Sequence, residues 1–200
     1  MPKSASSQTT AKAAKRAAVD KAKAIAPARR VRMGSTPRTA FRGDPAIFGR
    51  LVEDHDRHRA LLAMIEDSEP GSKDRAALFT ELTCELKSHA AAEEQALWSS
   101  VLRNPATTDD GRHAVAEHKQ IDDMLADLAA RDMAKKGWIK RFAALKDKYL
   151  HHLREEEQEQ FVSAERTLTA TDKRHMLRVF NARKRAEKDA AKLTPKIKLT

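Results

Sequence analysis

The stretches HAAAEEQALW (residues 89–98) and HLREEEQEQF (residues 152–161) share one arrangement. Each begins with a histidine, carries two acids at its fifth and sixth positions and ends in an aromatic residue. Side chains four residues apart lie one above the other on the same face of an α-helix. Each stretch therefore places a histidine and a glutamate on one face, and the repetition predicts two helices that serve a common site.

The composition favours helices. Of the 200 residues, 34% are charged and only 4% aromatic, with 6 glycines and 7 prolines, which argues against a β-sandwich or barrel. The lone cysteine, Cys84, excludes an intrachain disulfide and a zinc ribbon. No apolar run approaches the ~18 residues of a membrane span, and the first residues lack the apolar stretch of a secretory signal. We therefore expect a cytoplasmic protein with no membrane association.

Charge divides the chain into three parts. Residues 1–42 contain 11 Lys and Arg and one acid, residues 173–200 have a net charge of +8, and the part between them has a net charge of −8. The N-terminal part has too few large apolar residues to bury itself, so we expect it to be disordered. The predicted parts are a basic Ala/Lys/Arg-rich tail (1–43), a helical bundle (44–168) and a C-terminal helix with a basic tail (169–200).

Apolar residues recur at spacings of three and four, which predicts four amphipathic helices. Asp44 and Pro45 suit the cap and the first position of the first helix, and Ser72 suits the cap of the second. The short connections predict an all-α, antiparallel up-down four-helix bundle. A weaker fifth helix is expected to start near Thr171. The third and fourth helices are expected at about 108–131 and 134–166.

The apolar stripe of each of the four helices contains a histidine, and in two helices a glutamate follows one turn later. In an antiparallel bundle these side chains can meet at one depth. A buried unpaired carboxylate costs several kcal/mol or shifts its pKa, and cations would offset that cost. Imidazole and carboxylate together suit iron, manganese or zinc, and two ions can share six ligands if the glutamates bridge them. The six residues are His55, His89, Glu93, His118, His152 and Glu156.

This pattern resembles the hemerythrin-like, HHE cation-binding family over about residues 45–165. The resemblance implies a non-haem di-iron centre able to meet oxygen, nitric oxide or peroxide. It implies two iron ions, Fe²⁺ or Fe³⁺, bridged by carboxylates and an oxo or hydroxo group, with those six residues as ligands. The motifs that carry it are DH (54–55), HAAAEEQALW (89–98), EHKQI (117–121) and HLREEEQEQF (152–161).

The sequence departs from the oxygen-carrying hemerythrins at two positions. Those proteins have a second histidine one turn after the third-helix histidine, where this chain has Asp122. Their fourth-helix carboxylate follows its histidine by five residues, which here is Glu157, whereas Glu156 follows the HHE form. These departures weaken the oxygen-carrier interpretation. Either Asp122 or the inward-facing His58 could supply a further ligand, and Tyr149 could line the site.

Other assignments at the same helices stay open. His151 and Glu155 offer the same spacing as His152 and Glu156, but the apolar row of the fourth helix continues to His152. We therefore choose the latter pair. For the second acid of each motif, Glu94 and Glu157, a solvated face is slightly favoured over support of a metal ligand. His113 and His175 are expected to be surface or packing residues.

Three functions compete on this evidence. The histidine-rich ligand set favours a protein that binds or senses oxygen, nitric oxide or peroxide rather than an enzyme. The same centre could instead consume peroxide or oxidise ferrous iron, with Tyr149 as a relay. Thirdly, the basic ends could tether a redox sensor to nucleic acid through salt-sensitive phosphate contacts, at residues 1–42 and 173–200. An Arg-rich, acid-poor N-terminus also resembles a transit peptide.

Overall fold

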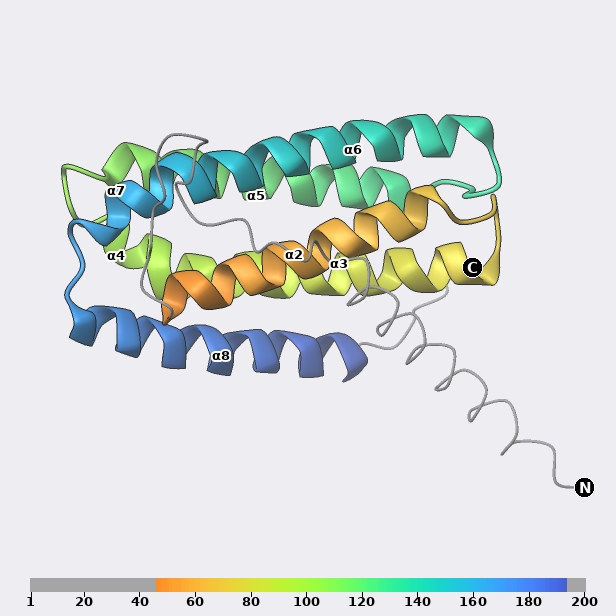
Figure 1. Cartoon of the computed structure of the whole chain (residues 1–200). Helices are drawn as coiled ribbons and strands as arrows, with labels where there is room; N and C mark the ends of the chain where they lie inside the picture. The colour runs from red at the N-terminus through yellow and green to blue at the C-terminus, as the bar shows by residue number, and fades with distance from the viewer. Residues whose placement is uncertain (1–45, 194–200) are drawn as a thin grey trace, which may run out of the picture.

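The computed structural model describes residues 46–193, and every regular element in that range is helical (Figure 1). Four long helices form the predicted antiparallel up-down bundle, and a fifth long helix lies beside it. The expected cap at Asp44 and the helix start at Pro45 lie outside the described residues. The long helices are α2 (Ile47–Glu66), α3 (Lys73–Glu93), α5 (Thr108–Ala129), α6 (Lys136–Glu155) and α8 (Ala170–Leu193).

Local sequence signals explain the connections between the helices. Gly71 has φ +68° in the turn after α2, a conformation that side chains with a Cβ rarely adopt. Ser72 caps α3 as predicted, because its side chain accepts a hydrogen bond of 3.0 Å from the Arg75 amide. At the turn between α5 and α6, which lies at the same end of the bundle, the Trp138 indole donates to the Leu128 carbonyl and joins the start of α6 to the end of α5 (Figure 1).

Two apolar clusters fill the bundle, one toward each end. The first contains Leu62, Leu82 and Phe142, and the second contains Phe48 and Trp98, among others. Along each bundle helix, the inward-facing row of residues runs from one apolar cluster to the other, with buried polar residues between them. The fold therefore places a polar layer in the middle of an otherwise apolar interior.

Helix α8 packs against α2 and α3 on the outside of the bundle (Figure 1). Met176 and Phe180 point inward from it and belong to the second apolar cluster. Lys184, one turn further along, is also buried. The predicted fifth helix is thus confirmed, and it is longer and more closely integrated than its basic composition indicated.

Two π-helical segments interrupt the expected continuous second and fourth helices. They are η1 (Glu94–Trp98), followed by α4 (Ser99–Val101), and η2 (Glu156–Gln160), followed by α7 (Phe161–Glu165). Both coincide with the two quoted motifs. Single π-turns inside α-helices are frequent at functional sites, and the spacing pattern of the sequence does not indicate them.

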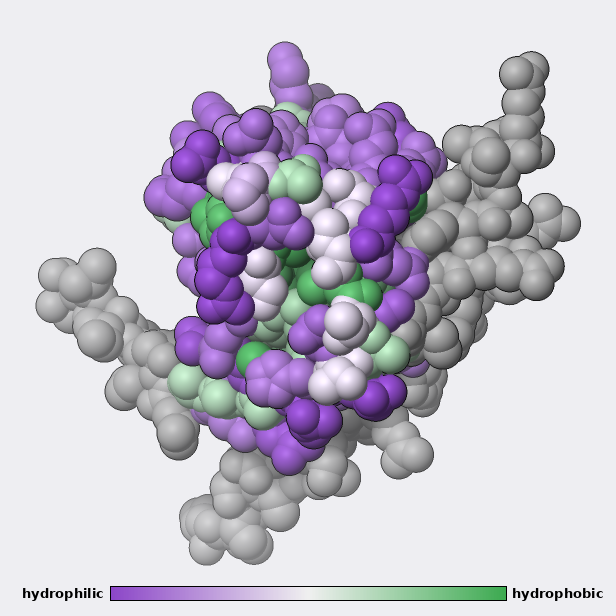
Figure 2. Space-filling model, turned by 90° about the vertical axis from the view of Figure 1, so that its left-hand side faces the viewer, coloured by the Kyte–Doolittle hydropathy of each residue, from purple (hydrophilic) through white to green (hydrophobic). Residues whose placement is uncertain are grey.

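At the α4 and α7 end of the bundle, hydrophilic residues surround a smaller hydrophobic area (Figure 2). This distribution agrees with a domain whose apolar side chains lie mostly inside. Among residues 46–193, no helix is both long and apolar enough to cross a membrane.

Candidate metal centre

Six side chains from the four bundle helices meet in the polar layer. The imidazoles form two pairs: Nε2 of His55 lies 3.3 Å from Nε2 of His89, and the rings of His118 and His152 have centroids 5.0 Å apart. Ligand atoms of the second pair and of one glutamate lie within 4.8 Å of one another. The buried set that the structure brings together is the predicted one, His55, His89, Glu93, His118, His152 and Glu156.

The two glutamates lie between the two imidazole pairs. Glu93 Oε2 lies 3.5 Å from Nε2 of one imidazole in each pair, His89 and His118. Glu156 contacts the remaining imidazole of each pair with a different oxygen: Oε2 lies 3.4 Å from Nε2 of His55, and Oε1 lies 3.4 Å from Nε2 of His152. Each carboxylate therefore spans both pairs, which is the arrangement that two bridged cations require.

The hydrogen bonding of these carboxylates tests whether cations fit. Glu93 and Glu156 are fully buried, and within the described chain none of their four oxygens accepts a hydrogen bond. Burying two ionised carboxylates side by side is costly unless cations compensate their charge. Neutral imidazoles and carboxylates are ligands for iron, manganese and zinc. The donor set therefore fits two divalent cations.

The pKa values show what the side chains do when no metal compensates them. Burial, followed by the charge of Glu93, raises the pKa of Glu156 well above its usual range. Burial also raises the pKa of Glu93, but the neighbouring imidazoles, His118 first, outweigh it and hold that pKa well below its usual range. Glu93 and Glu94 outweigh the burial of His118 and raise its pKa to about 9. Burial lowers the pKa of His152 to about 4.

Metal uptake should consequently release protons. At pH 7 the metal-free centre holds a proton on His118, whose pKa is about 9, and burial raises the pKa of Glu156 in the same direction. His118 must lose its proton to bind a cation, so we expect release of at least one proton per chain on loading at pH 7. Affinity should rise as pH rises toward 9. An indicator-dye titration in weak buffer measures the release, and stoichiometric uptake without proton release would contradict the assignment.

Each of the four histidines also directs its Nδ1 atom at a carboxylate from another helix. A carboxylate can only accept, so Nδ1 of the neutral ring carries the proton and the Nε2 lone pair faces the centre. Such partners orient metal-ligating histidines. The pairs run in order round the bundle: His89 with Asp54 (3.1 Å), His118 with Glu94 (2.9 Å), His152 with Glu117 (2.9 Å) and His55 with Glu157 (2.8 Å).

The sequence pattern indicates no role for two of these four acids, Asp54 and Glu117. For the other two, Glu94 and Glu157, it slightly favours a solvated face. Asp54 and Glu117 each directly precede a histidine of the polar layer, a signal that the DH and EH pairs contain. Glu157 is buried, so the expectation of a solvated face was wrong. Glu94 is partly exposed yet still contacts His118. The acid adjacent to each ligand supports the histidine of the neighbouring helix, which sequence spacing within one helix could not show.

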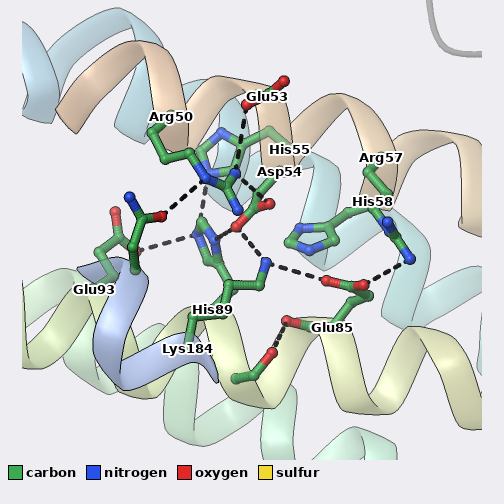
Figure 3. A network of polar contacts seen from close by, with 12 residues as sticks. Arg50, Glu53, Asp54, His55, Arg57, His58, Glu85, His89, Glu93 and Lys184 are labelled. Atoms are coloured by element: carbon green, nitrogen blue, oxygen red, sulfur yellow. Dashed lines mark hydrogen bonds and ion pairs between the residues drawn. The ribbon is translucent and has the colours of Figure 1, made fainter. Parts of the chain in front are cut away.

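The acceptor of His89 belongs to a larger charge network (Figure 3). Lys184 reaches from α8 between Asp54, with which it is ion-paired, and Glu85 Oε2 at 3.1 Å. Arg50 contacts the other oxygen of Asp54 at 2.6 Å. Cationic partners and the His89 hydrogen bond outweigh burial and hold the pKa of Asp54 well below its usual range. Helix α8 thus helps to keep this carboxylate ionised.

Of the two residues proposed as further ligands, His58 lies beside the buried centre and Asp122 lies at the surface. His58 is fully buried beside His89, and its Nδ1 lies 2.7 Å from the Tyr149 hydroxyl, while its Nε2 has no hydrogen-bond partner among the described residues. Asp122 does not join the six residues. It is ion-paired with Lys87 at 2.8 Å, and both side chains are about half exposed.

A cavity of about 310 Å³ lies between α3 and α5, and it connects the surface near Lys87 and Asp122 with the buried centre. Leu86, Ile121 and Leu125 are among the residues that line it, and its inner residues include His118 and His152. The wall between the surface and the imidazoles is therefore largely apolar. Four charged residues also line the cavity, Lys87, Glu94, Lys119 and Asp122, while most of the exposed wall is apolar and suits small uncharged molecules.

Comparison with known proteins agrees with this geometry. The hemerythrin HHE cation binding domain matches residues 46–162, which is more than half of the chain. A crystal structure of a hemerythrin HHE cation binding domain-containing protein from Mycobacterium kansasii is 25% identical, with a TM-score of 0.66. The similarity covers 72% of this chain and 88% of that one. No curated protein matches the chain. The chain therefore belongs to the hemerythrin HHE cation-binding domain family and is a metal-binding protein.

Proposed function

We propose that the chain is a non-haem di-iron protein that binds or senses oxygen, nitric oxide or peroxide. The observation that carries this proposal is the pair of fully buried glutamates, Glu93 and Glu156, whose oxygens have no hydrogen-bond partner in the described chain. Each spans both imidazole pairs, so two cations would share them. Bound iron would supply a redox-active centre with open coordination positions for a small ligand.

The residues of the chain would hold and orient that centre. The four imidazoles would each offer Nε2, and the ring of acids fixes their orientation through Nδ1. Arg59 contacts Glu157 at 2.7 Å and neutralises this buried acid, which is the acceptor of His55. The protein thus contributes a preorganised ligand set whose charge is balanced outside the ligands themselves.

The apolar passage between α3 and α5 supports a small uncharged ligand. It is lined by Leu86, Ala90 and Leu125, and it ends at imidazoles from the second pair and at Tyr149. Oxygen, nitric oxide and hydrogen peroxide all satisfy this requirement. The cytoplasmic location expected from the sequence remains a prediction.

An enzyme that consumes peroxide or oxidises ferrous iron is the alternative. The buried Tyr149 hydroxyl, 2.7 Å from Nδ1 of His58, favours it, because a tyrosine beside a metal centre can relay a proton. Burial and the charge of Glu156 raise the pKa of Tyr149 well above its usual range, so it keeps its proton. Repeated turnover distinguishes the enzyme from a binding protein.

The first experiment is elemental analysis of the protein purified without added metal, together with its visible spectrum in air. We expect about two irons per chain, the number that two bridged cations require, with an oxo-to-iron absorption band. The reduced protein is then exposed to oxygen, nitric oxide or peroxide. A colourless protein that also fails to take up ferrous iron anaerobically would rule out the di-iron centre.

A nucleic-acid tether is a separate proposal for the basic ends. Residues 1–42 contain 11 Lys and Arg and one acid, enough for non-specific phosphate binding. Deleting residues 1–42 should weaken DNA binding at moderate salt in a gel-shift assay. Unchanged affinity would remove this role from the N-terminal part.

A further inference from the structure

A second group of imidazoles and carboxylates lies on the outer side of α5 and α6. Two His-x-x-x-Glu pairs form it: His113 with Glu117 on α5, and His151 with Glu155 on α6. None of the four belongs to the six residues of the buried centre. The spacing nevertheless repeats that of the buried pairs, so each helix again presents one imidazole above or below one carboxylate.

Three of these side chains converge from the two helices, and His151 contacts one of them, Glu155. His113 Nε2 lies 3.1 Å from Glu155 Oε2 and 3.6 Å from Glu117 Oε2, and ligand atoms of these three residues lie within 4.8 Å of one another. His151 Nε2 lies 3.2 Å from the other oxygen of Glu155. The Glu155 carboxylate is therefore held between two imidazoles, and two helices fix the arrangement.

The chemistry and exposure of this group suit a metal ion that arrives from solvent. The side chains of His113 and His151 are 55% and 51% exposed, whereas Glu117 is buried at the inner side. Two imidazoles and two carboxylates match the ligand preference of zinc and similar divalent transition metals. The open side leaves room for water as a further ligand.

The same group contacts the buried centre through one residue. Glu117 Oε2 accepts from His152 Nδ1 at 2.9 Å, and Oε1 binds Lys148 at 2.5 Å. A carboxylate oxygen has two lone pairs, so Oε2 can accept from His152 and still face the cation. A cation there would draw electron density from Glu117 and weaken its bond to His152, an expected ligand of the buried centre.

We propose that His113, Glu117, His151 and Glu155 form a surface site for one divalent transition-metal ion, of which zinc is the representative. The site is distinct from the buried centre and shares with it only the contact between Glu117 and His152. It stands whether or not the buried centre holds iron, because its ligand atoms come from other residues.

The test uses the full chain, loaded with ferrous iron anaerobically and freed of unbound metal. Zinc is titrated by calorimetry into wild type, the double variant His113→Ala/His151→Ala, and the control His175→Ala, which removes an exposed histidine from α8. Wild type and the control should bind one zinc per chain that the double variant does not. Cobalt should likewise give visible absorption bands that the double variant lacks.

Equal zinc stoichiometry and dissociation constants in all three proteins would overturn the surface site. Both replaced histidines are about half exposed, so thermal unfolding should be unchanged and loss of zinc cannot reflect loss of the fold. Iron content, measured on the same samples, reports on the buried centre separately. A chain without iron that still shows the zinc difference would refute the di-iron proposal alone.

Discussion

The double substitution Glu93→Gln/Glu156→Gln is expected to abolish metal binding at the buried centre at a modest cost to the metal-free fold. Glutamine keeps the shape of each side chain but removes the negative charge that two bridged cations need. Burial raises the pKa of Glu156, so a neutral amide suits that position in the metal-free protein. At the other position, the substitution removes a carboxylate that lies 3.5 Å from Nε2 of His118, whose pKa is about 9. The free energy of unfolding should therefore fall by about 1.5–3 kcal/mol, the usual contribution of a hydrogen bond to a charged group.

The measurement compares iron per chain and urea unfolding in the presence of a chelator. Glu159→Gln is the matched control, because Glu159 is exposed in the same π-helical segment and contacts none of the six residues. The control should retain iron and wild-type stability. If the double variant kept its iron, the two glutamates would not be the bridging carboxylates. An unchanged urea midpoint without metal would show that the contact between Glu93 and His118 does not stabilise the metal-free fold.

The sequence could predict the buried histidines and glutamates of the polar layer because helical periodicity alone places them. His55 lies in a 3/4 row with Leu51 and Leu62, and all three are buried in one face of α2. The same reasoning chose His152 over His151, and the structure buries the first and exposes the second. Each of these inferences needs only the spacing within one helix.

The acids that support the histidines could not be predicted from the spacing within one helix, because each supports a histidine of another helix. Asp54 accepts from a histidine of α3, and Glu117 accepts from a histidine of α6. Those contacts depend on how neighbouring helices rotate about their axes, which periodicity leaves undetermined. The π-helical segments have the same limitation. One segment begins directly after Glu93 and the other begins at Glu156, and no residue type in the sequence marks either start.

One missed residue did leave a signal in the sequence. Lys184 follows Met176 and Phe180 at intervals of four, so it continues the inward row of α8. The expectation of a weak helix with a basic tail follows from the total charge of the segment, which does not distinguish Lys184 from the exposed cations. A lysine in the apolar row of a helix predicts a buried acidic partner, because lysine is rarely buried without one.

Replacing Lys184 with methionine should accordingly have a large effect on both stability and metal binding. Methionine fills similar space but leaves Asp54 and Glu85 without their shared buried cation. Breaking a buried ion pair from one side typically costs about 3–5 kcal/mol, and we expect about 3 kcal/mol because Arg50 still contacts Asp54. Asp54 also orients His89, so iron affinity should fall about tenfold, the lower end for loss of such support.

Two further variants separate the role of Lys184 from general packing. Lys188→Met removes a partly exposed cation that contacts the same Glu85 but not Asp54, so it should cost less stability and leave iron affinity unchanged. Adding Asp54→Asn to Lys184→Met should recover part of the stability, because a neutral amide needs no cation and its oxygen can still accept from His89. Equal losses from Lys184→Met and Lys188→Met, with no recovery in the double variant, would show that α8 contributes only packing. Recovery would instead make α8, which lies beyond the matched residues 46–162, part of the machinery that orients a metal ligand.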